Sequence, residues 1–259
     1  MKAIILSAGQ GTRLLPLTSD KPKCTLKLEG RAIIEWQIDA LIAAGVHDIV
    51  VVAGYKMEKV QRLLDRRYGR GAVKIVFNPF YEVADNLASC WMVRGEMTGD
   101  FLLINGDTLF EPVLASRMIA QKPPITLARD EKPHYDDDDM KLILQGDRLL
   151  SIGKKLPLER VNGESIGMIR FHPEGADLFR QTIEECMREP AALQRWYLSV
   201  IDEISQSGQP VWTHNIHGLD WMEIDYPLDF KHAEAMVRQW DWSAASAEEA
   251  PEIHLSTTY

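Results

Sequence analysis

MKAIILSAGQGTRLLPLTSDKPK, residues 1–23, places an apolar run at 2–6 directly before a loop that holds two glycines, two prolines and three cations. The run predicts a buried strand, and the loop begins where that strand ends. Glycines let the backbone come close to a ligand and turn successive N–H groups toward one point, where they bind anions. We therefore predict an α/β sheet whose first strand leads into an anion-binding loop.

Strand and helix patterns alternate from this loop as far as residue 107. Short apolar runs predict further buried strands at 47–54, 73–78 and 100–107. Helical periodicity predicts helices at 32–45, 56–69 and 86–97. This alternation predicts a doubly wound, mostly parallel, Rossmann-like sheet with helices on both faces. Ligands bind such sheets at the carboxyl ends of the strands, which here carry residues 9–13, Gly54, Tyr55, Asn78 and Asp107.

The second half of the chain has a different pattern. From about residue 123 the segments are β-rich, with helices expected at 173–189, 193–206 and 228–239. We expect these strands to extend the sheet and to wall off the substrate side. The prediction is a single domain over 1–240, with halves at 1–122 and 123–240, and a polar, acidic and flexible tail at 241–259.

Overall composition argues against nucleic acids and membranes as partners. The 259 residues carry a net charge of −9 at pH 7, which opposes binding to a polyanionic surface. The N-terminal apolar run is too short for a signal peptide or a membrane span, so we expect a cytoplasmic protein without membrane insertion. Its cysteines, Cys24, Cys90 and Cys186, lack metal-ligand spacing and predict neither a disulfide framework nor a zinc site.

Two common phosphate-binding loops do not fit the glycine loop. A dinucleotide fingerprint needs a third glycine and a helix directly after it, whereas prolines break this stretch. A P-loop needs a Gly-Lys-Ser/Thr ending, which is absent. A dinucleotide-dependent oxidoreductase is further opposed because the second strand ends in Gly54 and Tyr55 rather than in a ribose-binding acid. What remains is a glycine turn with Arg13 and Lys23, two cations that suit a polyphosphate.

The stretch at 8–23 resembles the signature of the nucleotidyltransferases that join a nucleoside triphosphate to a sugar phosphate or an alcohol phosphate, written A-G-x-G-T-R-x-x-P-x-T…x-P-K. LINGDTLF at 103–110 and WMEIDYPLDF at 221–230 strengthen the resemblance. Ser7 stands where the family usually has alanine, and we expect little change from one small residue to another. The resemblance implies that Arg13 holds the leaving phosphates and that Lys23 holds the α-phosphate and the incoming phosphate. It also implies a Mg²⁺ ion on Asp107 and Asp225, whose hard oxygens suit this metal.

The nucleotide is expected to be CTP. The segment at 77–93, FNPFYEVADNLASCWMV, resembles the cytidylyltransferases for phosphocholine and related alcohol phosphates. The expected nucleotide-binding residues are Leu6, Ala8, Gly9, Gly11, Thr12, Arg13, Gly54, Tyr55, Asn86 and Ser89. Asn86 and Ser89 equally suit the start of a helix, for which Asp85 is the better cap. UTP and GTP stay open as alternatives.

The acceptor is the least determined part of the site. Trp196, Trp221 and Tyr135, together with the four aspartates at 136–139, could surround an ammonium group through cation–π contacts, although such tryptophans are more often core and such a run is more often a solvated loop. Resemblance to inositol-phosphate and sugar-phosphate members implies instead that Lys154 faces the acceptor phosphate and that Glu164 accepts hydrogen bonds from hydroxyl or ammonium groups of the acceptor. The first expected acceptor is a phosphocholine-like aminoalcohol phosphate, and the alternatives are a polyol or sugar phosphate or a phosphonate.

The hypothesis is therefore an enzyme that transfers CMP from CTP to a small phosphorylated acceptor. A phosphate monoester is largely a dianion at neutral pH, so the nucleophile needs no general base and no catalytic triad is expected. A catalytically silent nucleotide-binding homologue is the competing class. Such a protein would tend to lose the cations or the expected metal carboxylates, whereas this sequence keeps Arg13, Lys23, Asp107 and Asp225. A homodimer is compatible with the sequence.

Overall fold

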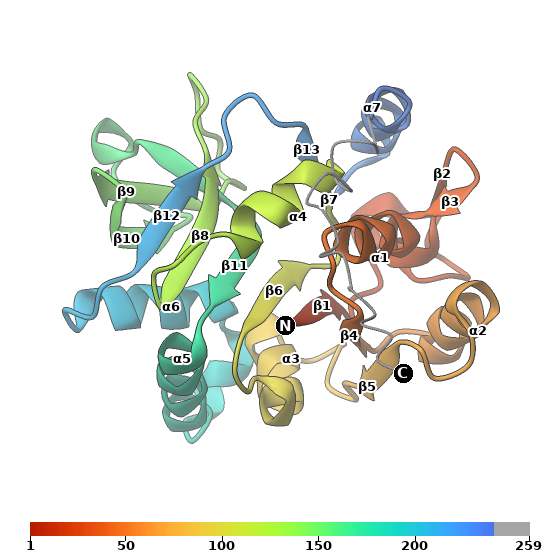
Figure 1. Ribbon diagram of the computed structural model, residues 1–259, viewed down its shortest axis with the longest axis horizontal. Helices are drawn as coiled ribbons and strands as arrows, with labels where there is room; N and C mark the ends of the chain where they lie inside the picture. The colour runs from red at the N-terminus through yellow and green to blue at the C-terminus, as the bar shows by residue number, and fades with distance from the viewer. Residues whose placement is uncertain (241–259) are drawn as a thin grey trace, which may run out of the picture.

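A nine-stranded sheet forms the centre of the molecule, with strand order β5-β4-β1-β6-β11-β8-β12-β10-β9 (Figure 1). The computed structural model describes residues 1–240, and the flexible tail predicted at 241–259 lies outside them. The strands of the sheet are β1 (Lys2–Ser7), β4 (Asp48–Ala53), β5 (Lys74–Phe77), β6 (Phe101–Asn105), β8 (Ile125–Asp130), β9 (Lys141–Gln145), β10 (Arg148–Gly153), β11 (Gly163–Phe171) and β12 (Trp212–Asn215).

The first half of the sheet is parallel, as predicted. Strand β1 lies between β4 and β6, and Ile4 faces both Val50 and Leu103 in the register. Its neighbour β4 also pairs in parallel with β5. These strands are short runs of β-branched and other apolar residues that are buried on both faces, which is the pattern of a parallel sheet covered by helices.

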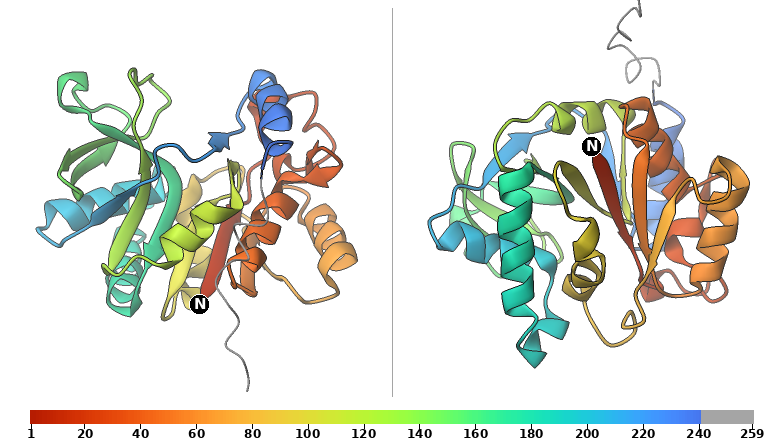
Figure 2. Two further views of the ribbon diagram at one scale, coloured as in Figure 1. Left: turned by 45° about the horizontal axis from the view of Figure 1, so that its top comes forward. Right: turned by 60° about the horizontal axis from the view of Figure 1, so that its bottom comes forward.

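Helices cover the two faces of this sheet. One face carries α1 (Ile33–Ala43), α2 (Met57–Tyr68) and α4 (Pro112–Ile119), and the other carries α3 (Asn86–Val93), α5 (Pro173–Cys186) and α6 (Tyr197–Gln206). Side chains alternate along a strand, so Ile4 and Leu6 of β1 join the core of the second face while Ala3 and Ile5 join that of the first. Figure 2, right, turns the α3 and α5 side toward the viewer. The doubly wound α/β class is therefore confirmed.

The second half of the sheet is mixed. Strand β11 runs antiparallel to both β6 and β8, and β12 runs parallel to β8. At the far edge, β10 pairs antiparallel with β12 and β9. This is the β-rich extension that the sequence predicts.

The helix expected at 193–206 begins later, at Tyr197. Residues Pro190–Gln194 form a separate 3₁₀ turn, and Trp196 is extended. The cause is a contact with the start of α3: the N–H of Asp85 donates to the carbonyl of Leu193 at 2.7 Å, and the N–H of Leu87 donates to the carbonyl of Arg195 at 3.2 Å. These carbonyls are thus used outside their own helix.

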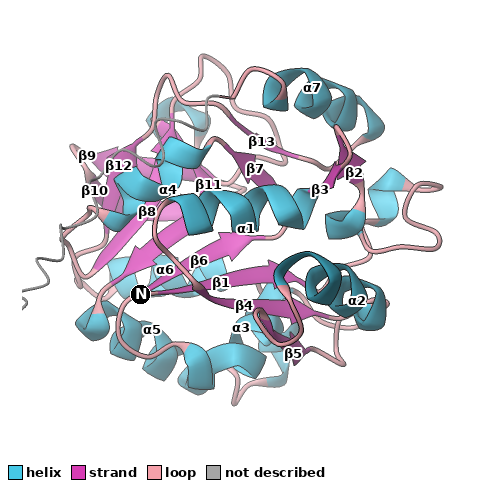
Figure 3. Ribbon diagram, turned by 45° about the vertical axis from the view of Figure 1, so that its right-hand side comes forward, coloured by secondary structure: helices cyan, strands magenta, loops and turns pink. Residues whose placement is uncertain are grey.

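Several short elements were not predicted. They are helix α4, the two-stranded pair β7 (Thr108–Phe110) with β13 (Trp221–Glu223), and the hairpin of β2 (Lys27–Leu28) and β3 (Arg31–Ala32). Figure 3 shows β7 and β13 side by side, above α1 in that view. The last helix, α7 (Pro227–Val237), follows β13 and packs with Leu14 and Leu28 in a third apolar cluster. The β7–β13 pair thus brings the segments after β6 and before α7 together.

No helix in residues 1–240 combines the length and the apolar character that crossing a membrane requires.

Candidate active site

A cavity of about 240 Å³ lies at the carboxyl ends of β1 and β6 and beside the β7–β13 pair. It is lined by Leu6, Ser7, Gly9, Gly11, Thr12, Arg13, Lys23, Cys24, Gly106, Asp107 and Asp225. The structure therefore brings together both predicted cations and both predicted metal carboxylates with most of the glycine loop. These residues are remote in sequence, and the strand order makes them neighbours.

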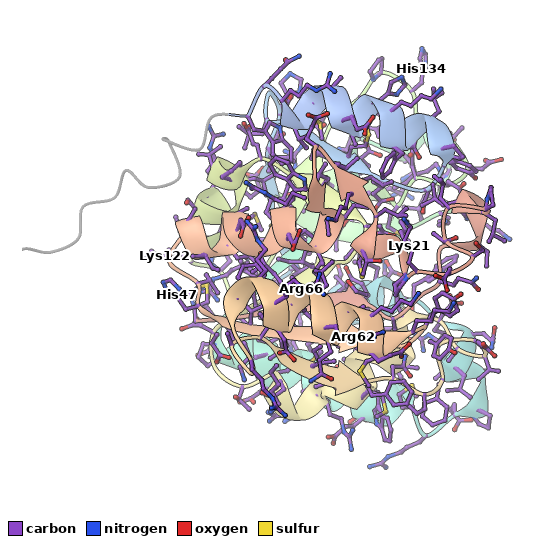
Figure 4. All side chains as sticks on the ribbon, turned by 90° about the vertical axis from the view of Figure 1, so that its right-hand side faces the viewer. Lys21, His47, Arg62, Arg66, Lys122 and His134 are labelled. Carbon is purple, nitrogen blue, oxygen red and sulfur yellow. The ribbon has the colours of Figure 1, made fainter. Side chains whose placement is uncertain are left out.

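The glycine loop is folded back over Lys23. Gly11 is left-handed, with φ of 75°, and a Cβ atom there would lie 2.8 Å from the Cβ of Lys23. The hydroxyl of Thr18 donates to the Gly11 carbonyl at 2.8 Å and holds the turn. Only glycine satisfies both the backbone conformation and the close approach. Lys21 of the same loop is exposed at the surface, away from this role (Figure 4).

Lys23 connects the two carboxylates. Its Nζ lies 3.0 Å from Asp107 Oδ2 and 2.7 Å from Asp225 Oδ1, and Arg13 reaches the other oxygen of Asp225 at 3.1 Å. Burial would lower the pKa of Lys23, but the two adjacent carboxylates outweigh burial and raise it. Lys23 is therefore a fixed cation at neutral pH.

Asp107 and Asp225 also meet the requirements of a metal site that is completed by substrate. Both reach the same Lys23 nitrogen, so their oxygens converge on one region. Within residues 1–240, no group of three or more His, Cys, Asp and Glu residues is arranged to hold a metal. Two hard oxygen ligands suit Mg²⁺, which keeps several waters and takes phosphate oxygens as further ligands.

A second cavity, of about 270 Å³, adjoins the first through Leu6, Gly9 and Asp107. Its remaining lining residues are Ala8, Asn78, Tyr81, Ala84, Asp85, Asn86, Ser89 and Asn105. Asn78 Nδ2 donates to Ser89 Oγ at 3.0 Å, and Asn86 Oδ1 accepts from the N–H of Tyr197 at 2.9 Å. Asp85 occupies the N-cap position of α3 without a side-chain capping bond. The polar groups in this cavity are therefore held in place.

Two predicted nucleotide residues lie behind this cavity rather than in its lining. A Cβ on Gly54 would lie 2.7 Å from the carbonyl oxygen of Ala8, so the two backbones touch. The N–H of Tyr55 donates to that same carbonyl at 2.9 Å, and its hydroxyl donates to the Ser19 carbonyl at 2.7 Å. Gly54 and Tyr55 thus support the glycine loop from outside.

Some residues of the second cavity were missing from the predicted site. Asn78, which directly follows β5, was expected only as a strand-end residue; Asn105 was not named, although its position at the end of β6 was the signal that could have placed it there. Tyr81 lies in an irregular segment that gave no comparable signal.

Three further cavities open on the side of the sheet extension. One of them, about 740 Å³, is lined by Asp137, Lys141, Lys154, Lys155, Leu156, Leu158 and Trp196 and does not include Asp107 or Asp225. The other two, called here the smaller and the larger extension cavity, both include Asp225. The smaller, about 120 Å³, is lined in part by Lys154, Trp196, Glu223 and the two metal carboxylates. The larger, about 330 Å³, is lined in part by Glu164, Trp221 and Glu223. Tyr135, which was predicted beside them, lines neither cavity.

The aspartate run forms one wall of these two cavities. Asp138 Oδ1 lies 3.2 Å from Lys154 Nζ and 3.6 Å from Arg13, while the hydroxyl of Tyr226 donates to Oδ2 at 3.2 Å. The hydrogen bond from Lys154 lowers the pKa of Asp138. Lys141, which could have been a surface charge, is buried and donates to the carbonyls of Asp136, Asp139 and Lys154. The run is thus tied down at several points, while His134, earlier in the same loop, is exposed (Figure 4).

Aromatic rings near these cavities already have cationic neighbours. The Lys154 ammonium lies 5.0 Å from the ring centroid of Trp196, and Lys132 lies 5.9 Å from that of Tyr135. Arg13 lies 5.5 Å from the ring of Tyr226, a residue that the sequence reasoning left out.

Two carboxyl groups on the extension side have raised pKa values. Burial raises the pKa of Glu164 to about 7, although Lys132 lies 2.9 Å away and opposes this. Burial, followed by the charges of Asp107 and Asp225, raises the pKa of Glu223 to about 8. Glu223 was missed by the sequence reasoning. Its place in the site depends on the pairing of β13 with β7, where it lies opposite Thr108.

Residues 2–123 match the family model described as "Nucleotidyl transferase". Over this stretch, which is just under half of its length, the chain is similar to nucleotidyl transferases. The match includes the glycine loop and Asp107, and Asp225 lies outside it.

The chain is similar to curated proteins of several kinds. Over 111 residues it is 37% identical to the choline-phosphate cytidylyltransferase of Streptococcus pneumoniae, covering 43% of this chain and 47% of that protein. Over 248 residues it is 27% identical to the CMP-5'-(3-aminopropyl)phosphonate synthase of Streptomyces rubellomurinus, covering 90% of this chain and 38% of that one. The matched part is therefore less than half of either relative.

The fold of residues 1–240, with its β-rich extension, also occurs in solved structures. The inositol-1-phosphate CTP transferase of T. maritima matches with a TM-score of 0.77 and 20% identity, covering 96% of this chain and 97% of that one. At this level of identity the likeness concerns the fold alone, and it includes the β-rich extension.

Proposed function

We propose that this protein is a cytidylyltransferase that transfers CMP from CTP to a small phosphorylated alcohol and releases pyrophosphate. The observation that carries the proposal is the convergence of Arg13, Lys23, Asp107 and Asp225 on one cavity. A cavity that could hold a base adjoins it on one side, and further cavities adjoin it on the other. Three adjoining compartments are what a reaction between a nucleotide and a second phosphate requires.

The proposed reaction is a direct displacement at the α-phosphorus of CTP. An oxygen of the acceptor phosphate forms a bond to that phosphorus, and the bond to the bridging oxygen of the β-phosphate breaks. Pyrophosphate leaves with the electron pair, and no proton has to be removed from a phosphate dianion. The protein therefore has to align the reactants and stabilise crowded negative charge.

Each charged residue has a distinct part in this proposal. The planar guanidinium of Arg13 suits bidentate contact with the leaving phosphates. The ammonium of Lys23, already fixed by two carboxylates, suits the α-phosphate and the incoming phosphate. Asp107 and Asp225 would hold Mg²⁺, which neutralises phosphate charge when bound. Lys154, which lines the smaller extension cavity together with Asp107 and Asp225, would contact the acceptor phosphate.

CTP is the proposed nucleotide because the second cavity is small and carries fixed amide and hydroxyl groups. Asn78, Asn86 and Ser89 can form hydrogen bonds with the edge of a pyrimidine. The two curated relatives named above are a cytidylyltransferase and a CMP-phosphonate synthase, which supports the same choice. UTP and GTP are the alternatives.

A phosphocholine-like aminoalcohol phosphate is the leading proposed acceptor, and a polyol or sugar phosphate or a phosphonate is the alternative. Three further statements stay predictions. They are a single domain over 1–240 with a nucleotide half at 1–122 and an acceptor half at 123–240, a cytoplasmic location, and a homodimer.

The test is release of pyrophosphate by the purified full chain with Mg²⁺. Each of CTP, UTP and GTP is combined with phosphocholine, phosphoethanolamine, inositol phosphate, sugar phosphates and 2-aminoethylphosphonate. We expect turnover with CTP, with the CDP-linked product identified by its mass, and loss of turnover on chelation that added Mg²⁺ restores. Absence of pyrophosphate release with every pair would contradict the proposal in favour of a nucleotide-binding homologue.

A further inference from the structure

The larger extension cavity, of about 330 Å³, is strongly acidic. Its lining includes one lysine, Lys132, and seven carboxylates: Asp136, Asp138, Asp139, Glu164, Glu223, Asp225 and Asp229. It shares Asp138, Met140, Ser165, Glu223 and Asp225 with the smaller cavity that also holds Lys154. An acceptor whose phosphate lies beside Lys154 can therefore extend its other end into the acidic cavity.

Most of these carboxylates are already occupied within the protein. Glu164 and Asp139 contact Lys132 at 2.9 and 2.8 Å. Asp229, the N3 residue of the capping box of α7, accepts the N–H groups of Asp225 and of the N-cap Tyr226. The remaining acids are likewise engaged, Asp136 by backbone N–H groups and Asp138 and Asp225 by cations.

Glu223 differs from all of them. Its carboxyl group makes no hydrogen bond or ion pair with any residue in 1–240, although it lines both extension cavities. Its position is fixed by the backbone of β13, which pairs with β7 opposite Thr108. A partly buried carboxyl group without a partner, surrounded by other acids, is costly in its ionised form, and a ligand cation beside it would stabilise that form.

The aromatic rings favour one kind of cation over another. A quaternary ammonium group has no N–H and is held mainly by open aromatic faces. Here Trp196 and Tyr226 already have Lys154 and Arg13 over their rings. The indole N–H of Trp221 is taken by Asp130 at 2.8 Å. A group that donates N–H bonds to a carboxylate fits these surroundings better.

We propose that the acceptor carries an N–H-bearing ammonium group, as in a short primary aminoalkyl phosphate or phosphonate, and that Glu223 is its counter-charge. This inference rests on the proposed function and narrows its acceptor. The acceptor phosphate lies toward Lys154 and the ammonium lies toward Glu223, so the two ends of one small zwitterion meet opposite charges. Glu223 selects the acceptor and takes no part in the bond that forms at phosphorus.

The first test compares acceptors with the unmodified full chain, CTP and Mg²⁺. The panel is phosphoethanolamine, 2-aminoethylphosphonate, phosphocholine and ethylene glycol monophosphate, which replaces the ammonium by a hydroxyl. We expect kcat/KM for the better primary amine to exceed that for phosphocholine and for the hydroxyl acceptor by roughly 10- to 100-fold, the worth of a hydrogen bond to a charged group. A preference for phosphocholine or for a polyol phosphate would overturn this inference and leave the proposed function standing. Absence of pyrophosphate release with every acceptor would contradict both the proposed function and this inference.

The second test changes the proposed counter-charge. Glu223→Gln keeps the size of the side chain and removes its charge, so the ratio of kcat/KM for phosphoethanolamine over ethylene glycol monophosphate should fall by about 10-fold or more, mainly through KM. The matched control is Glu159→Gln, because Glu159 is exposed and lines none of the three cavities on the extension side. The control should keep the wild-type ratio. An equal loss with both acceptors, or a changed Mg²⁺ requirement, would assign Glu223 to the metal region and refute the proposed role.

Discussion

Lys23 Nζ lies 2.7 Å from Asp225 Oδ1, although 202 positions separate the two residues in the chain. The contact depends on β13, which pairs with β7 directly after Asp107. The N–H of Ile224 donates to the carbonyl of Asp107 at 3.1 Å, so the backbones beside the two carboxylates are joined as well. The charged centre is therefore assembled by a three-residue strand.

Asp107→Asn and Asp225→Asn should each lower turnover by about 10²–10³-fold or more, because each removes a charge from the proposed metal site. The unfolding free energy should change by no more than about 1 kcal/mol, since Lys23 keeps the other carboxylate as a partner. Steady-state kinetics and urea unfolding measure the two effects. Asp20→Asn is the control, because Asp20 forms exposed ion pairs with Lys56 and Lys59. Near-normal turnover in either active-site variant would remove the metal assignment.

Gly11→Ala should impair nucleotide binding. The new Cβ would lie 2.8 Å from Lys23 Cβ at a φ of 75°, so it must either displace Lys23 or unwind the turn. The strain of a left-handed alanine costs about 1–2 kcal/mol of stability. We expect a larger loss in kcat/KM for CTP than this strain alone explains.

Gly30→Ala separates the two causes. Gly30 has a similar φ of 79°, yet a Cβ there would meet nothing within 4 Å. This variant should lose a comparable amount of stability with unchanged kcat/KM. Equal kinetic losses in both variants would show that the contact between Gly11 and Lys23 is unimportant.

Lys141→Met should loosen the aspartate run. The buried ammonium of Lys141 binds the carbonyls of Asp136, Asp139 and Lys154, and methionine leaves them without a donor. An unsatisfied buried acceptor costs about 1–3 kcal/mol, so we expect lower stability together with a higher KM for the acceptor. The KM for CTP should change little, because these residues lie outside the nucleotide cavities. Lys155→Met removes an exposed neighbour and serves as the reference; an equal rise in its acceptor KM would refute the argument.

Stability should depend on pH through Glu164. Its pKa is raised from 4.5 to about 7 in the folded protein, so the folded state holds this proton more tightly than the unfolded chain does. The resulting stabilisation is present below pH 4.5 and is lost as the pH rises through 7. Relative to the wild type, Glu164→Gln should therefore gain about 1–3 kcal/mol in unfolding free energy between pH 5 and pH 8.

Urea unfolding of both proteins without ligands at several pH values measures this gain. Glu159→Gln, which changes an exposed carboxyl group nearby, should show a pH-independent difference from the wild type. A pH-independent difference for Glu164→Gln as well would contradict the raised pKa.

The parallel half of the fold could be predicted because its signals are local. Lys2–Ser7 is an apolar run followed at once by the glycine loop, and the later strands repeat the pattern with helices of clear periodicity between them. The same signals placed Asp107 at a strand end. Element ends were less well determined: Trp196 is extended because the carbonyls of Leu193 and Arg195 before it bind the start of α3, a contact that sequence periodicity does not contain.

The extension side of the site depended on pairings that the sequence does not specify. Glu223 lies in a strand of only three residues, and its role follows from its register with Thr108. Lys141 has no local sign of being buried, because its acceptors are carbonyl oxygens of neighbouring loops. Tyr226 enters the site only because α7 begins next to it and the aspartate run approaches from the other side.

The contact between the start of α3 and residues 193–197 limits how this protein could be re-engineered. Asn86 lines both the nucleotide cavity and the smaller extension cavity, and its side chain holds the N–H of Tyr197, next to Trp196. A graft that exchanges only the 78–93 segment to accept another base would leave the wall of the neighbouring compartment without its anchor. A chimera that changes nucleotide choice should therefore carry the two segments together, as one transferable unit.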